Sequence, residues 1–271
     1  MKLHIDQQFS VDISQNRWQQ LKQFTDARIA LGRAGSSLPT KPQLEFQLAH
    51  AQAKDAVLKQ LDVAQLEQQL AGLQHPIMHI QSAAEEKDTY LKRPDLGREL
   101  DEASRQALMQ LAAQQQQYDV LFVVGDGLSA RAIEDNIPHF LPQLLQMCQQ
   151  QNWSIAPIML ATGSRVALGD EVAQILKTRM LVMLIGERPG LSSPDSLGIY
   201  YTLDAFKGCQ DAARNCISNI RPAGLSYPVA TQRLLGLMQG SLQLGESGVN
   251  LKDQHEMVLD NTAPKNQTRL F

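Results

Sequence analysis

Three short apolar runs, separated by longer and more polar segments, dominate the second half of the chain. The runs cover residues 119–125, 155–162 and 180–186. The segments between them, 128–150 and 165–179, are long enough to be helices. Strands that are buried on both faces have continuous apolar sequences, and helical crossovers join parallel strands. The pattern therefore predicts an α/β fold with a Rossmann-like parallel sheet flanked by helices.

The first part of the chain has a different pattern. It is rich in glutamine and lacks β-branched runs, and apolar residues such as Leu44 and Leu48 recur at helical spacing. We therefore expect three parts: a helical N-terminal region over residues 1–115, a Rossmann-like α/β domain over 116–253, and a C-terminal tail over 254–271.

Composition excludes several classes of protein. The chain has 271 residues, of which 43% are hydrophobic, so it can bury a sizeable core. Its 25 Lys and Arg residues against 28 Asp and Glu residues give a net charge of -3. This balance argues against a nucleic-acid binder that neutralises phosphates and against attachment to an anionic membrane surface.

The sequence suggests neither a membrane span nor a signal peptide. No apolar run approaches the roughly 18 residues of a membrane span, and the N-terminus lacks the apolar stretch of a signal peptide. The three cysteines, Cys148, Cys209 and Cys216, cannot all pair, and none stands in a C-x-x-C motif. We expect a reduced, cytoplasmic protein.

The first loop after a predicted strand, GDGLSA, has the form G-x-G-x-x-A and covers residues 125–130. One interpretation is an NAD(P)-dependent oxidoreductase, in which this loop holds a pyrophosphate. Asp126 argues against it, because its carboxylate would stand near the phosphate charge. The next predicted strand ends at Thr162, without an acidic residue to hold a ribose. We favour a tight turn, with Ser129 in the first turn of the following helix.

The loop after the third predicted strand, GERPGLSSPDSLG, covers residues 186–198 and is long for a strand-to-helix connection. It contains two prolines and three glycines, and Glu187 and Arg188 stand directly at the strand end. A long, stiff, polar loop at this edge of a sheet is typical of a functional site. The alternative is a surface loop with an internal pair between Glu187 and Arg188.

The segment RNCISNIRPAGL, residues 214–225, concentrates hydrogen-bonding side chains around Cys216. Asn215 and Asn219 are four residues apart, so we expect them to share one face of a helix. Together with Arg214, Ser218 and Arg221 they would suit a large ligand rich in amide groups. The alternative is a segment whose asparagines satisfy its own backbone. Cys216 by itself would be a small buried apolar residue, because no histidine or carboxylate in the segment could activate it.

The two segments GERPGLSSPDSLG and RNCISNIRPAGL closely resemble the small (light) subunit of ethanolamine ammonia-lyase. ARIALGRAG, HAQAKDAV, RPDLGREL, GDGLSA, RVALGDE and GVNLKD also resemble that family, in the same order, so the resemblance covers residues 25–253. Lys54 and Glu99 depart from it, because the family more often has arginine there. The tail after residue 253 runs past the usual end.

The resemblance implies an enzyme that depends on adenosylcobalamin and on a second, large subunit. Such an enzyme converts ethanolamine and related vicinal amino-alcohols to acetaldehyde and ammonia by radical chemistry, with the cofactor between the two chains. It also implies a hexamer of heterodimers, and it leaves open whether a bacterial microcompartment encloses the enzyme. A non-catalytic docking module remains an alternative.

The resemblance also implies that Val166, Glu187 and Cys216 bind the cofactor. Val166 and Cys216 would pack against the corrin ring, and Glu187 would accept hydrogen bonds from the amide groups at its rim. The chain lacks a D-x-H-x-x-G segment, through which a histidine would bind the cobalt. We therefore assign it no metal ligand and no catalytic residue.

Overall fold

The computed structural model describes residues 17–25, 27–114 and 116–252 of the chain. Contacts within the chain define two compact units, of which the first ends at Ala51 and the second begins at Gln52. The predicted tail over residues 254–271 lies outside the described residues. No helix in the described ranges is long and apolar enough to cross a membrane.

The second unit holds all the strands of the main sheet. These are β1 (Ile77–Gln81), β2 (Val120–Gly125), β3 (Ile158–Thr162), β4 (Met180–Gly186), β5 (Leu197–Leu203) and β6 (Asn215–Ile220). The α-helices of the described chain are α1 (Thr40–Leu58), α2 (Val63–Leu70), α3 (Lys87–Lys92), α4 (Glu102–Ala112), α5 (Ala130–Gln150), α6 (Leu168–Leu176) and α7 (Tyr227–Leu244). Short 3-10 helices are η1 (Arg17–Phe24), η2 (Ala71–Leu73), η3 (Leu96–Arg98) and η4 (Asp211–Ala213).

The six strands form one sheet in the order β1-β3-β2-β4-β5-β6. Strands β1, β3, β2 and β4 are parallel, whereas β5 is antiparallel to β4 and β6 is antiparallel to β5. The last two strands therefore extend the parallel part of the sheet by a meander. In the register of β5 and β6, Tyr200 stands opposite Cys216.

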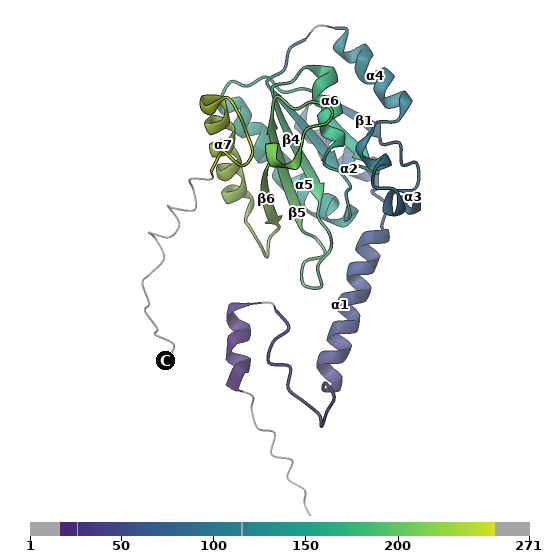
Figure 1. Cartoon of the computed structure of the whole chain (residues 1–271), viewed down its shortest axis with the longest axis vertical. Coiled ribbons are helices and arrows are strands. Elements are labelled where there is room, and N and C mark those ends of the chain that lie inside the picture. Colours follow the sequence, from purple (N-terminus) through teal and green to yellow (C-terminus); the bar gives the residue numbers. More distant parts are fainter. Residues whose placement is uncertain (1–16, 26, 115, 253–271) are drawn as a thin grey trace, which may run out of the picture. The chain divides into compact units, whose positions relative to one another are not determined.

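Helices cover both faces of this sheet (Figure 1). Alternate side chains of β2 point to opposite faces, so Val120 and Phe122 join one apolar cluster and Leu121 and Val123 join the other. The first cluster is completed by side chains from α2, α5 and α7, and the second by side chains from α4 and α6. Burial on both faces explains why β2, β3 and β4 are nearly all apolar.

The structure confirms the predicted α/β class. Strands β2, β3 and β4 fall on the three apolar runs, although β3 begins at Ile158 rather than at residue 155. Helices α5 and α6 occupy the two segments expected to be crossovers. The boundaries predicted at residues 115 and 253 stay a prediction.

Three strands of the sheet were not predicted from the sequence. Strand β1, within the region expected to be helical, is a partly exposed edge strand with the sequence IMHIQ, which shows neither a long apolar run nor many β-branched residues. Strands β5 and β6 follow β4 without a helix between them. The loop over residues 186–198 is therefore the connection of an antiparallel pair, not a strand-to-helix connection.

The first unit buries little apolar surface. Trp18, Phe24, Leu38, Leu44 and Leu48 are all exposed. In this unit the ring of Phe46 stacks on His50, with centroids 6.2 Å apart, and the Arg28 guanidinium lies 5.9 Å from the centroid of Phe46. The apolar stripe predicted for α1 is present, but it is not part of either core cluster.

Candidate functional site

The loops that follow the parallel strands β2, β3 and β4 lie at one edge of the sheet. They follow Gly125, Thr162 and Gly186, the carboxyl ends of the parallel strands β2, β3 and β4. In open α/β sheets ligands bind outside these ends.

The GDGLSA loop is a tight turn, as favoured from the sequence. Gly127 has a φ of +54°, and a Cβ atom there would lie 2.3 Å from the carbonyl oxygen of Gly186. The hydroxyl of Ser129 accepts a hydrogen bond from the N–H of Ala132 (3.2 Å) and so caps the start of α5. The same hydroxyl donates to the carbonyl of Pro194 (2.8 Å), which ties this turn to the loop after β4.

The backbone of this loop does not offer the cradle that a dinucleotide needs. The N–H groups of Asp126, Leu128 and Ser129 donate to the carbonyls of Ala161, Gly186 and Asp126, respectively. A pyrophosphate at this turn would have to displace these bonds. The geometry therefore argues against the NAD(P) alternative.

Asp126 is a buried carboxylate at the same turn. Its Oδ1 accepts a hydrogen bond from the N–H of Ser164 (3.0 Å), and its Oδ2 lies 3.8 Å from the ammonium of Lys87. Burial raises the pKa of the Asp126 carboxyl, and the Lys87 charge opposes that shift. Asp126 thus connects the loops after β2 and β3.

A cleft of about 560 Å³ opens on the face of the sheet that α6 covers. Its walls come from the turn at residues 94–98, from the loop after β3, from β5 and β6, and from residues 209–211. Val166 contributes from the loop and Cys216 from β6. The structure therefore brings together two of the three residues predicted to bind a cofactor.

Glu187, the third predicted residue, is not among the residues that line this cleft. Its Oε2 accepts hydrogen bonds from the Ser196 hydroxyl and from the N–H of Asn219 (3.2 Å), and its Oε1 accepts one from the Ser218 hydroxyl. Glu187 therefore connects the end of β4 to β6. One of its partners, Ser218, is two residues from Cys216 in that strand. An ionised carboxylate has about four acceptor sites, so Oε1 retains capacity for one more donor.

Tyr200 and Cys216 form a cross-strand pair in the cleft. Tyr200 packs against the core cluster beneath the cleft, as does Val166. Cys216 is exposed, but the protein around it raises the pKa of its thiol, and the hydrogen bond with Tyr200 only partly opposes that shift. Burial raises the pKa of Tyr200 to about 12. Both groups are neutral near pH 7, which gives this wall an apolar character.

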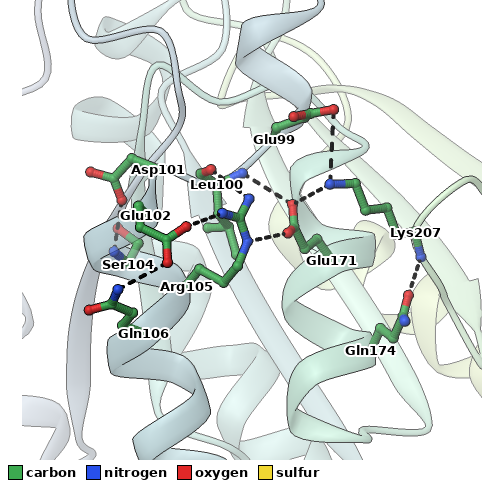
Figure 2. A network of polar contacts seen from close by, with 10 residues as sticks. All are labelled: Glu99, Leu100, Asp101, Glu102, Ser104, Arg105, Gln106, Glu171, Gln174 and Lys207. Carbon is green, nitrogen blue, oxygen red and sulfur yellow. Dashed lines mark hydrogen bonds and ion pairs between the residues drawn. The ribbon is translucent and has the colours of Figure 1, made fainter.

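Asp170 and Glu171, in the first turn of α6, hold the walls of the cleft. Asp170 pairs with Arg214, which stands just before β6. The Glu171 carboxylate accepts a hydrogen bond from Arg105 Nε (2.9 Å) and lies 3.4 Å from the ammonium of Lys207. Figure 2 shows how Arg105 and Lys207 reach Glu171 from opposite sides.

This network extends into the segment before α4. The N–H of Leu100 donates to Glu171 (3.2 Å), and Arg105 donates to the carbonyl of Leu100 (3.0 Å). Glu99, one of the departures from the family pattern, lies 3.9 Å from the Lys207 ammonium (Figure 2). Leu100 lies close in sequence to Arg98, and Lys207 lies close in sequence to residues 209–211. The network therefore connects two segments that line the cleft.

The segment around Cys216 differs from the expectation. It forms strand β6, so the predicted helix face shared by Asn215 and Asn219 is wrong. Asn215 instead bonds the backbone of Gly248 and Leu251, as the alternative interpretation proposed. Some of the side-chain donors that were expected to bind a ligand therefore form hydrogen bonds within the protein.

Sequence reasoning missed several residues of the cleft. Arg98 and Arg165 stand inside the motifs RPDLGREL and RVALGDE, but nothing in the sequence indicates that these two segments adjoin. Tyr200 was missed because β5 was not predicted. In the described ranges, no group of three His, Cys, Asp or Glu side chains is arranged to hold a metal ion.

The fold and the cleft define a mixed α/β protein with a cleft beside the loop that follows its parallel strand β3. A family model described as ethanolamine ammonia-lyase light chain (EutC) matches residues 15–252. The chain belongs to this family.

Curated relatives agree with this assignment. The ethanolamine ammonia-lyase small subunit of Pseudomonas aeruginosa PAO1 is 50% identical over 254 residues, which cover 93% of each chain. That of Ralstonia nicotianae GMI1000 is 50% identical over 255 residues and 94% of each chain. That of Pseudomonas fluorescens Pf0-1 is 51% identical over 244 residues, or 90% of this chain and 89% of the relative.

Proposed function

We propose that this chain is the small subunit of an adenosylcobalamin-dependent ethanolamine ammonia-lyase and covers one side of the cofactor. Together with a large subunit it would convert ethanolamine, or a related vicinal amino-alcohol, to acetaldehyde and ammonia. The observation that carries the proposal is the cleft that brings Val166 and Cys216 together in a chain of this family.

The residues of the cleft fit part of a corrinoid. A corrin ring has broad apolar faces, and its rim carries amide side chains. Val166 and Tyr200 offer apolar surface, and the neutral thiol of Cys216 lies beside them. Gln210 offers an amide donor to amide carbonyls, and Glu187 beside the cleft retains an acceptor site.

The cleft is smaller than a complete cobalamin, so this chain would enclose only one side. Bound adenosylcobalamin would supply the radical chemistry. The residues of this chain would bind and orient the cofactor and exclude water from it. We assign none of them to proton transfer or to cobalt.

A partner chain would supply the other wall. The relatives are named small subunits, and the first unit of this chain exposes large apolar side chains, among them Trp18, Phe24 and Leu44. Exposed apolar surface of this kind is typical of a protein interface. The proposed assembly is a hexamer of heterodimers, which the mass of the purified complex would test.

Co-expression with the large subunit from the same genome tests the proposal. The complex should copurify, change the absorption spectrum of added adenosylcobalamin and release ammonia from ethanolamine. The separate chains serve as controls and should release none. A complex that forms but neither binds the corrinoid nor releases ammonia would instead support a docking module.

A further inference from the structure

Arg98 is an arginine of the cleft whose side chain has no partner among the described residues. It ends η3, its side chain is exposed, and it makes no side-chain hydrogen bond or ion pair with the described residues. By contrast, the exposed Arg93 nearby donates two hydrogen bonds to the carboxylate of Asp95. The guanidinium of Arg98 is therefore available to a ligand.

Arg165 is a second arginine of the same cleft with unused hydrogen-bonding capacity. Its Nε is buried and has no hydrogen-bond partner. Its guanidinium carbon lies 4.3 Å from the centroid of the Tyr90 ring, a contact that holds the side chain in place. One Nη2 N–H donates a long hydrogen bond to the carbonyl of Tyr90 (3.5 Å), so the guanidinium, which has five N–H groups, keeps donors without a partner among the described residues.

The two arginines come from segments that pack directly on each other. The backbone N–H of Arg165 donates to the carbonyl of Gly97 (2.7 Å). A Cβ atom on Gly97 would lie only 2.9 Å from the Cγ of Arg165, so glycine permits this close approach. Arg98 therefore adjoins the loop that carries Arg165.

The remaining charges of the cleft do not neutralise these two arginines. A third arginine, Arg214, is already paired with the buried carboxylate of Asp170. Asp211 is the acidic residue among those that line the cleft, and it lies 3.4 Å from the Nε of Arg214. The wall formed by Arg98 and Arg165 is therefore positively charged, although the chain as a whole is weakly acidic.

We propose that Arg98 and Arg165 form a phosphodiester site. Planar guanidinium groups match the geometry of phosphate oxygens and can bind them through two parallel hydrogen bonds. The inference rests on the proposed function, since cobalamin carries one phosphodiester in its nucleotide. These two arginines would thus bind that group and set the orientation of the corrinoid along the cleft.

A comparison of two corrinoids distinguishes binding at this site from binding by the rest of the cleft. Adenosylcobalamin contains the phosphodiester, whereas adenosylcobinamide lacks the whole nucleotide. The Kd of each is measured by spectral titration of the complex with the large subunit. In Arg98→Ala the affinity for adenosylcobalamin should fall about tenfold or more, as for a lost hydrogen bond to a charged group. The affinity for adenosylcobinamide should be unchanged.

Arg165→Lys keeps the charge but removes the planar group, and it should lower the affinity for adenosylcobalamin selectively as well. Arg93→Ala is the matched control and should leave both affinities unchanged. If Arg165→Lys does not fold, Arg98→Ala decides the question.

An equal loss for both corrinoids in Arg98→Ala, or no loss for either, would overturn the phosphodiester site. A wild-type complex that binds adenosylcobalamin would in that case still support the proposed function. A wild-type complex that binds neither corrinoid would overturn the proposed function itself.

Discussion

Arg214 and Asp170 form a bidentate ion pair in the interior of the second unit. Nη1 of Arg214 lies 2.6 Å from Oδ1 of Asp170, and Nη2 lies 2.7 Å from Oδ2. The two side chains are only 3% and 1% exposed. The pair joins the first turn of α6 to the start of β6, and therefore connects the helix beside Val166 to the strand that carries Cys216.

Removal of one member of this pair should strongly destabilise the chain. Arg214→Leu leaves the carboxylate of Asp170 buried without a partner, and the expected loss in the free energy of unfolding is about 3–5 kcal/mol. The double variant Asp170→Leu with Arg214→Leu should lose less, because it leaves no uncompensated charge. Urea titration measures both. Equal losses in the single and the double variant would contradict the prediction.

Glu171 should make the stability depend on pH in the acidic range. Burial by itself would raise its pKa, but the hydrogen bonds from Arg105 and Leu100 and the charge of Lys207 hold the pKa below the usual 4.5. Because the folded state has the lower pKa, ionised Glu171 stabilises the fold above about pH 4.5. This contribution is lost as the pH falls through the folded-state value.

The variant Glu171→Gln tests this dependence. At neutral pH it should be less stable than the wild type by about 1–3 kcal/mol, and the difference should shrink in acid. Glu102→Gln removes an exposed partner of the same Arg105 and serves as control, with little expected effect. A difference between Glu171→Gln and wild type that is independent of pH would show that the charge of Glu171 is not responsible.

Glu187→Ala should weaken the binding of adenosylcobalamin to the two-chain complex without unfolding this chain. The variant loses an acceptor beside the cleft and also the bonds that hold Ser218 and Asn219 of β6. Spectral titration gives the Kd, and thermal denaturation monitors the fold. Glu246→Ala, at an exposed glutamate, is the control. An unchanged Kd in Glu187→Ala would rule out a role of this carboxylate in binding.

Cys216 should react slowly with iodoacetamide and be protected by the cofactor. Its raised pKa leaves little thiolate near pH 7, so alkylation should accelerate as the pH increases. Cys148 is buried, and burial raises its pKa to about 12, so it should stay unmodified in the folded protein. Mass spectrometry of the digested complex identifies the modified residue. Equal labelling of Cys216 with and without adenosylcobalamin would place the cofactor elsewhere.

The sequence by itself determined three of the four parallel strands and the class of protein. Strands β2, β3 and β4 could be predicted because burial on both faces requires continuous apolar runs, which are visible in one dimension. The tight turn at residues 125–130 could also be predicted, since it depends on residues close together in sequence. The family followed from two long motifs, and the comparisons confirmed it.

The tertiary structure alone decided which residues lie together in the walls of the cleft. Strands β1 and β6 derive their stability from neighbouring strands and helices, so their own sequences contain little signal. Strand β5 is rich in β-forming residues, but it follows β4 without the helical crossover that the pattern predicted. The pairing of Tyr200 with Cys216 and the approach of Gly97 to Arg165 join segments far apart in the chain. Such contacts depend on packing in three dimensions, which no local spacing encodes.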